Sequence, residues 1–349
     1  FSVTGSRIKR VYVESALPVT IIDREMIERS GETSVSDLLR NLTFNSFGSD
    51  ISQGGNINMG TDQIDLRGLG SGRSLVLVDG RRLPKSPVSA VQGYQNIAMI
   101  PMGAVERIEV LSDGASSIYG SDAIGGVNTI ITRRDYEGWE LMYGMAEPEW
   151  SDGARDEGTV MFGTSGENYR LLVNYSWNNR EVSYNRAFPG AESAASSFGN
   201  NFRTIDPDTG QFTSALTAVP GGCNGSDGFS LIPDEDSLSG DICVYDWTLY
   251  VTQGSSMDTQ GVQAKYEYEF RQEWRFWADL SASEVDSFAR FAPSPATGAW
   301  FRWPMPVDSL NNPTNPASSL YDPDFGPNVP AHFYHRFEAP GFRDMYREE

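Results

Sequence analysis

Few residues in this sequence are suited to bond-making chemistry. Its two cysteines, Cys223 and Cys243, lie in a stretch rich in Gly, Ser and Asp rather than in an apolar run. That setting favours a disulfide formed in an oxidising compartment, and closing a loop of this length would stabilise the fold by roughly 3 kcal/mol. Two free thiols are the alternative. We expect no metal at the cysteines, because no further Cys or His lies nearby.

Other candidate ligands and catalytic motifs are sparse. His332 and His335 are the only histidines; on a helix they could share a metal, but Pro330 and the aromatic neighbours predict a loop. Residues 206–210 and 322–326 read Asp-Pro-Asp-x-Gly, which could offer oxygen ligands to Ca²⁺ but is also a common turn. The sequence lacks the P-loop, His-Glu-x-x-His, Gly-x-Ser-x-Gly and dinucleotide-binding glycine patterns. We therefore expect neither an enzyme nor a resident metal or cofactor.

Composition limits the class of protein. The length of 349 residues allows two domains, and the net charge of −20 disfavours nucleic-acid binding, which needs a basic surface. No apolar run reaches the roughly 18 residues of a membrane-spanning helix, although a membrane-spanning strand needs only about ten alternating residues. Because the sequence starts with Phe1 rather than Met, we expect a mature or trimmed chain.

The first part of the sequence predicts short strands, helices and glycine-rich turns. Apolar runs favour strands over residues 18–22, 75–78, 105–111 and 127–131. Asp23 is placed to cap a helix over 24–30 that ends at Gly31, and Thr33 to cap a second helix over 34–41. Turn glycines surround the strands: Gly68, Gly70, Gly72, Gly80, Gly114, Gly120, Gly125 and Gly126.

Four motifs follow one another in this region. They are Leu66-Arg67-Gly68, Val76–Arg81, Val105–Val110 and Ile118–Asn128. Together they resemble the plug domain of TonB-dependent outer-membrane receptors. The resemblance implies an α+β plug over residues 1–135, followed over 136–349 by the N-terminal part of an antiparallel transmembrane β-barrel with long extracellular loops. The family barrel has 22 strands, so this chain would hold an incomplete one.

The resemblance also implies which plug residues meet a ligand. Two polar inserts, 47–62 and 84–96, correspond to connections that rise toward the ligand. The candidate contacts are Gln53, Asn56, Asn58, Lys85, Ser86, Tyr94, Gln95 and Asn96. Solvated loops without a role are the alternative.

A further set of plug residues carries the motifs and is expected to include ion pairs with the barrel. The set is Arg67, Gly68, Asp79, Gly80, Arg107, Glu109, Gly120, Gly125 and Gly126. For Arg67 and the Arg107/Glu109 pair we expect charged partners in the barrel lumen, because an unpaired Arg enclosed there would be costly. Ordinary surface charge is the alternative.

After Asp135 the sequence alternates between apolar and polar residues. The alternation covers 139–146, 168–180, 259–272 and 273–285, and a shorter run includes Val160 and Phe162. A soluble sandwich would alternate in the same way, but here short and long links also alternate, which is typical of a transmembrane barrel. Five strands cannot close a barrel, so we expect the remaining strands in a longer protein or a second chain, and a sixth strand to begin within 342–349.

The expected function is therefore energised import across the outer membrane of a Gram-negative bacterium. The ligand would be a ferric siderophore, a cobalamin, an oligosaccharide or a peptide. The expected partners are TonB with its inner-membrane energising complex, outer-membrane lipid and lipopolysaccharide, and the extracellular ligand; the TonB contact would lie within the first few residues. One alternative is a receptor-like barrel that acts as a scaffold for other surface proteins, and another is a secreted soluble β protein.

Overall fold

The fold was analysed in a computed structural model. It describes residues 19–32, 34–45, 60–86, 95–149, 152–188, 191, 195–223, 228–271, 274–297, 304–336 and 343–348. Contacts divide the chain into unit 1, which is Phe1–Ser183, Gln253–Ala289 and Tyr346–Glu349, and unit 2, which is Tyr184–Thr252 and Arg290–Met345. No helix within the described ranges is long and apolar enough to cross a membrane.

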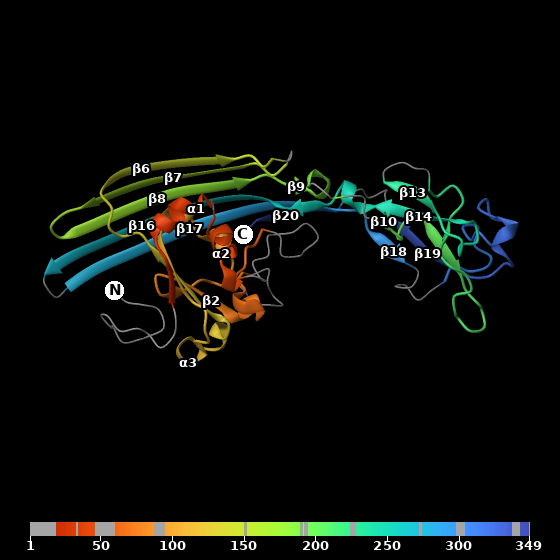
Figure 1. Cartoon of the computed structure of the whole chain (residues 1–349), viewed down its shortest axis with the longest axis horizontal. Coiled ribbons are helices and arrows are strands. Elements are labelled where there is room, and N and C mark those ends of the chain that lie inside the picture. The colour runs from red at the N-terminus through yellow and green to blue at the C-terminus, as the bar shows by residue number, and fades with distance from the viewer. Residues whose placement is uncertain are drawn as a thin grey trace. The chain divides into compact units, whose positions relative to one another are not determined.

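Unit 1 begins with a small α+β domain, which we call the plug domain (Figure 1). Its five-stranded sheet has the order β1-β4-β5-β2-β3. The strands are β1 (Val19–Ile22), β2 (Ser74–Val78), β3 (Arg81–Arg82), β4 (Val105–Leu111) and β5 (Gly126–Thr132), and the helices are α1 (Arg24–Ser30), α2 (Val35–Arg40) and α3 (Ser116–Tyr119). Short 3-10 helices occupy Thr43–Asn45, Leu66–Gly68, Ser71–Arg73, Ile97–Met99, Met102–Ala104 and Ser121–Ala123.

The helix caps follow local chemistry. The Asp23 side chain accepts a hydrogen bond from the Met26 amide at 2.9 Å, and Gly31 ends α1 with φ 68°, both as predicted. The cap of α2 was predicted one residue too early. Ser34 takes the extended cap conformation and accepts a hydrogen bond from the Asp37 amide at 3.1 Å, so the helix starts at Val35.

The plug core forms between the sheet and the helices α1 and α2. Ile22, Leu39, Leu66, Ile108 and Ile130 are among its fully buried side chains. These residues come from the predicted strands, the second helix and the first motif, so apolar burial holds the separate motifs in one domain.

A two-residue turn joins β2 to β3. Val78 pairs with Arg81, while Asp79 and Gly80 have φ values of 49° and 80°. Positive φ at both positions is the type I′ geometry, for which Asp-Gly is a preferred sequence. This turn fixes the place of the Asp79 side chain.

The rest of unit 1 is dominated by a second sheet of order β20-β17-β16-β8-β7-β6. Its strands are β6 (Gly138–Ala146), β7 (Arg155–Ser165), β8 (Tyr169–Arg180), β16 (Ser256–Arg271), β17 (Trp274–Phe291) and β20 (Arg343–Glu348). Neighbouring strands are antiparallel where β6 pairs with β7, β7 with β8, β8 with β16 and β16 with β17. Every strand predicted after Asp135 is present, and β20 lies where a sixth was expected.

The two faces of this sheet differ. The plug domain lies against one face (Figure 1), and this face carries polar residues such as Asn174 and Lys265. The opposite face leaves large apolar side chains uncovered; Trp139 and Leu141 are 74% and 79% exposed. The predicted alternation therefore separates a polar, plug-facing side from an apolar outer side.

Unit 2 is built from short strands. One sheet has the order β10-β14-β13, with β10 (Ala195–Ser196), β13 (Phe229–Pro233) and β14 (Asp241–Asp246); another has the order β12-β11-β19-β18, with β11 (Asn201–Thr204), β12 (Thr217–Ala218), β18 (Pro295–Thr297) and β19 (Ala331–Arg336). The strands β9 (Ser183–Tyr184) and β15 (Thr252–Gly254) lie where the chain passes between units, and 3-10 helices occupy Asn185–Ala187, Trp247–Leu249 and Pro323–Phe325. The disulfide Cys223–Cys243 joins the loop after β12 to β14.

Candidate functional site

The plug domain meets the large sheet through a buried ion pair. Lys265 Nζ, from β16, lies 2.6 Å from Asp79 Oδ2 in the β2–β3 turn. The two side chains are only 5% and 10% exposed. Thr132, at the end of β5, donates its hydroxyl to Asp79 and its amide to Asp79 Oδ1 at 3.0 Å, and it also contacts Lys265 Nζ. One carboxylate thus joins the turn, the last plug strand and the wall of the sheet.

The surroundings of Asp79 keep it ionised. Burial by itself opposes ionisation, but the hydrogen bonds from Lys265 and Thr132 outweigh it and hold the pKa of Asp79 below its usual range. Arg134 Nη2 also lies 3.7 Å from Asp79 Oδ2, but its side chain is 46% exposed. Removing Lys265 would therefore leave the buried Asp79 carboxylate with only this longer ion pair, which is destabilising. The pair is therefore suited to fixing the plug domain on the sheet.

A second charged contact joins helix α2 to β7. Asp37 accepts from Arg155 Nη1 at 2.9 Å and from Arg40 Nη1 at 2.7 Å. The Ser34 hydroxyl adds a third hydrogen bond at 2.9 Å. Burial opposes ionisation here too, but Arg155, Arg40 and Ser34 together hold the pKa of Asp37 below its usual range. The Asp37–Arg155 ion pair thus joins a different plug segment to a different strand of the sheet than the Asp79–Lys265 pair does.

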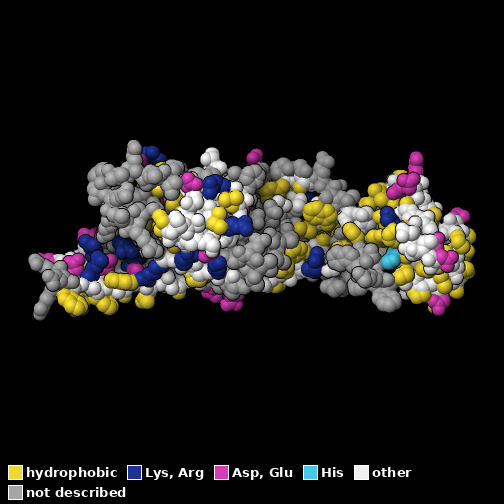
Figure 2. Space-filling model, turned by 90° about the horizontal axis from the view of Figure 1, so that it is seen from below, with side chains coloured by type: hydrophobic (Ala, Val, Ile, Leu, Met, Phe, Trp, Pro, Cys, Tyr) yellow, Lys and Arg dark blue, Asp and Glu magenta, His cyan; other side chains and the backbone are white. Residues whose placement is uncertain are grey.

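The segment that follows β5 adds more ion pairs. Arg133 pairs with Glu140 of β6 through two hydrogen bonds of 2.7 and 3.1 Å. Arg134 Nη1 lies 3.6 Å from Glu267 of β16. On the face seen in Figure 2, Lys and Arg side chains gather over the plug domain and the strands beside it. Arginines in the segment that links β5 to β6 thus form ion pairs with strands of the large sheet.

A cavity of about 440 Å³ lies between the β2–β3 hairpin and strands β16 and β17. Its polar lining comes from both sides: Asp79, Arg81, Arg82, Lys85, Thr132, Gln263, Asp279, Ser281 and Ser283. Arg81 also lies over the ring of Trp277, with 4.7 Å between the guanidinium carbon and the ring centroid. Apolar residues such as Met99, Ile100 and Val262 complete the lining, so the plug domain and the sheet border a cavity of mixed polar and apolar character next to the Asp79–Lys265 pair.

The structure describes only some of the predicted ligand contacts. Gln53, Asn56, Asn58 and Tyr94 lie outside the described residues. Gln95 and Asn96 are buried, and their amides bond to plug backbone: Gln95 to Val76, and Asn96 to the amides of Asp62 and Ala98. In this conformation both amides are used for structure.

Lys85 and Ser86 are placed differently. The Ser86 hydroxyl is buried and accepts from Arg347 of β20 at 3.0 Å. Lys85 lines the cavity, is exposed and lies 3.7 Å from Asp122. Of the described candidates, Lys85 has the geometry that best suits ligand contact, which stays a prediction.

The motif residues mainly shape the plug domain. Arg67 lies 3.6 Å from Asp113, and Arg107 lies 3.0 Å from Glu109. These are contacts within the plug domain, and pairing of these residues with barrel strands stays a prediction. Gly68, Gly80, Gly120 and Gly126 have positive φ, as their turns require. A side chain at Gly126 would also place its Cβ 2.4 Å from the carbonyl oxygen of Leu111.

Unit 2 contains the two cysteines and the two Asp-Pro-Asp segments. Cys223 and Cys243 are joined, as predicted. The Asp206 carboxylate accepts the amides of Asp208 and Thr209, which holds its pKa below the usual range, and Asp322 accepts the amide of Asp324. Both Asp-Pro-Asp segments are therefore turns stabilised by their first Asp.

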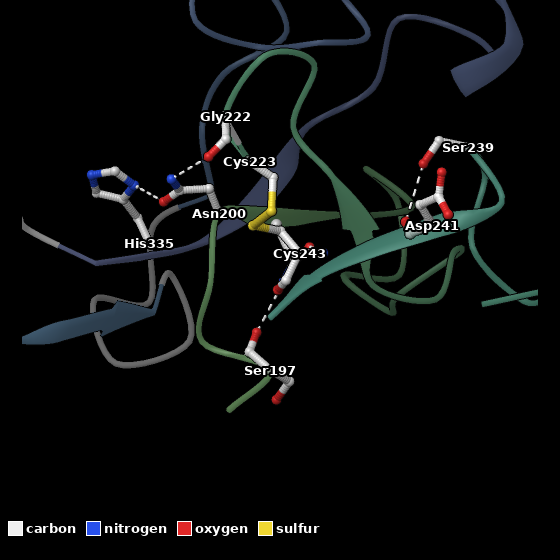
Figure 3. The surroundings of a disulfide bond; sticks show 9 residues. Ser197, Asn200, Gly222, Cys223, Ser239, Asp241, Cys243 and His335 are labelled. Atoms are coloured by element: carbon white, nitrogen blue, oxygen red, sulfur yellow. Dashed lines mark hydrogen bonds between the residues drawn. A yellow bond between two sulfur atoms is a disulfide. The ribbon is translucent and has the colours of Figure 1, made fainter. Parts of the chain in front are cut away.

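The histidines belong to a strand. His332 and His335 lie in β19, where this spacing directs their side chains to opposite faces. Figure 3 shows His335 directed toward Asn200, with 2.5 Å between His335 Nδ1 and Asn200 Oδ1. Among the described residues, no cluster of three or more His, Cys, Asp or Glu is suited to hold a metal ion.

Sequence reasoning missed Lys265, Thr132, Asp37 and Arg155 as interface residues. Lys265 carried a usable signal, since it is one of three lysines in the chain and lies on the polar face of an alternating strand. Asp37 looked like an ordinary helix-surface residue. Its contact with Arg155 joins residues 118 positions apart and leaves no local pattern.

One family model and several solved structures are similar to parts of this chain. Residues 13–127 match the family model of the TonB-dependent receptor plug domain. Among solved structures, the chain is similar to the ferric enterobactin receptor PfeA of Pseudomonas aeruginosa, with 20% identity, TM-score 0.46, and coverage of 80% of this chain and 34% of that one. It is also similar to the siderophore receptor PirA of Acinetobacter baumannii, with 23% identity, TM-score 0.39, and coverage of 79% and 40%. The chain thus spans about a third of the length of PfeA. The sequence motifs and the family model agree that residues 13–127 of this chain form a TonB-dependent receptor plug domain.

Proposed function

We propose that this chain is the plug-bearing part of an outer-membrane transporter that imports a scarce, bulky ligand. The plug domain would close the lumen of a barrel to which the six-stranded sheet belongs, and TonB would supply the energy that rearranges it. The ligand class stays open among siderophores, cobalamins, oligosaccharides and peptides.

The observation that carries the proposal is the way the plug domain is attached. It sits on the polar face of a sheet whose other face is apolar and uncovered. One buried ion pair and one partly buried ion pair, from two separate plug segments, fix it there. An apolar outer face suits lipid, and a polar inner face suits a charged plug. Such ion pairs are non-covalent, so a pull that separates them would release the plug domain from the sheet.

A reversible cross-link tests gating by the plug domain. A Cβ built on Gly103 lies 2.8 Å from Thr159 Cβ of β7, close enough for a disulfide after a small shift. In cells that carry the double variant Gly103→Cys/Thr159→Cys, oxidation is expected to stop uptake and reduction to restore it. The single variant Thr159→Cys, treated in the same way, is the control for effects on the native disulfide.

The uptake assay uses a defined panel in strains with and without TonB. The panel is ferric enterobactin, ferric citrate, cyanocobalamin and maltohexaose. Accumulation of one of them that needs both this protein and TonB supports the proposal. Full uptake through a cross-linked plug would rule out gating, and TonB-independent retention of surface proteins without uptake would favour the scaffold alternative.

A further inference from the structure

Arg203, in β11, differs from two other arginines of unit 2, Arg186 and Arg290. Arg186 lies 3.1 Å from Asp246, and Arg290 lies 2.7 Å from Asp344. Within the described part of the chain, Arg203 has neither a hydrogen-bond acceptor nor a carboxylate partner, and its Nε atom is buried from solvent. Partial burial of a cation without a counter-charge is unfavourable, so an anion bound there would be stabilised.

Aromatic rings surround this guanidinium. Its carbon lies 5.2 Å from the ring centroid of Phe212 and 5.9 Å from that of Tyr334. His332 lies opposite Arg203 in the β11–β19 register, and its ring meets that of Phe212 edge-on at 5.6 Å. Ring faces attract a guanidinium and leave its N–H edge for a planar acceptor such as a carboxylate.

The described residues leave part of the sheet face around Arg203 open. The opposite face is filled by Phe202 and Phe333, with Phe202 packed against Phe325. On the Arg203 face, Asn201 is covered because it bonds to the backbone of Cys243, at 2.6 and 2.7 Å. Farther along the same face Phe212 is 46% exposed, so a ligand can reach the rings around Arg203.

The charge of the chain narrows the class of ligand. A single guanidinium in a protein of net charge −20 favours a singly charged anion over a doubly charged phosphate. The rings favour an anion with a flat organic body. We propose that Arg203, Phe212, His332 and Tyr334 form a binding site for the carboxylate of a planar aromatic anion.

This inference adds a ligand class to the proposed function. It rests on the proposed function only for the transport of the bound ligand, since binding can occur without transport. Binding is measured by isothermal titration of the purified, detergent-solubilised protein with benzoate, and benzamide serves as the neutral analogue. The parent is expected to bind benzoate and to bind benzamide much more weakly, because the amide lacks the charge.

Arg203→Gln is expected to weaken benzoate binding about tenfold or more, through loss of charged hydrogen bonds. Arg186→Gln is the matched control and is expected to bind like the parent, since Arg186 already pairs with Asp246. Should Arg203→Gln fail to fold, Arg203→Lys keeps the charge but not the planar fork, and it is expected to bind several-fold more weakly.

The proposal is overturned if the parent does not bind benzoate, if it binds benzamide equally well, or if the Arg203 variants bind like the parent. Absence of TonB-dependent uptake alongside intact benzoate binding would count against the transport function and leave this site standing.

Discussion

Replacing Lys265 by Met tests the attachment of the plug domain most directly. The change removes the cation of a pair whose charged atoms lie 2.6 Å apart and keeps most of the side-chain volume. At an effective dielectric constant of about 20, two unit charges at this distance attract each other by ~6 kcal/mol. Desolvation of the two ions cancels much of that attraction, but removing one partner alone typically costs about 3–5 kcal/mol. We expect a loss at the lower end of that range for Lys265→Met, because Arg134 Nη2 stays 3.7 Å from the Asp79 carboxylate.

A double-mutant cycle separates the pair from its surroundings. Asp79→Asn removes the charge and leaves a side chain that tolerates the positive φ of this turn. The double variant Asp79→Asn/Lys265→Met contains no unpaired buried charge at this position. Its loss of stability is therefore expected to be smaller than the sum of the single losses, by about 2–3 kcal/mol.

Hydrogen exchange of the β2 and β5 amides measures these losses as free energies of local opening. The matched control is Lys85→Met, since Lys85 is 54% exposed and lies 3.7 Å from Asp122. An exposed pair contributes about 1 kcal/mol or less, so the control should change little. Additive losses in the cycle, or a Lys265→Met loss no larger than that of Lys85→Met, would refute the reasoning.

Three further predictions concern other parts of the chain. Asp37→Asn should lower the melting temperature at neutral pH. Because the pKa of Asp37 is lowered in the folded state, the difference in melting temperature from the parent should persist down to about pH 5 and shrink below about pH 4. Thermal melts recorded over a series of pH values would show this. Reduction of Cys223–Cys243 should destabilise unit 2 by about 2–4 kcal/mol and speed its cleavage in limited proteolysis, while β2 and β5 keep their hydrogen-exchange protection. Gly126→Ala should destabilise the plug domain by roughly 2 kcal/mol more than Gly80→Ala in thermal melts. Both glycines have positive φ, but only at position 126 would the added Cβ clash, with the Leu111 carbonyl oxygen. Equal losses of stability would mean that backbone strain alone sets the cost.

Local chemistry was readable from the sequence. The cap at Asp23, the left-handed Gly31, the Asp79-Gly80 turn and the alternating strands each depend on a few consecutive residues. The error at Thr33 has the same origin, because Thr33 and Ser34 can both cap a helix and only the backbone conformation chooses between them. The paired cysteines were likewise indicated by their polar setting.

Residues that serve function or attachment over long distances were harder to find. Gln95 and Asn96 have side chains that suit a ligand, yet burial and backbone partners commit them to the plug core. Among the described residues Arg203 has no hydrogen-bond acceptor at Nε, and the sequence could not predict this because it depends on where carboxylates distant in the chain lie after folding.

The sequence alone therefore determined the plug motifs, the turns, the strand alternation and the disulfide, because these depend on local backbone preference and on the period of apolar residues. Only the tertiary structure decided that Asp79 meets Lys265, 186 positions away, and that Asp37 meets Arg155. The physical reason is that ion pairing needs charges within a few ångströms in space, and sequence spacing does not set that distance once the chain has folded.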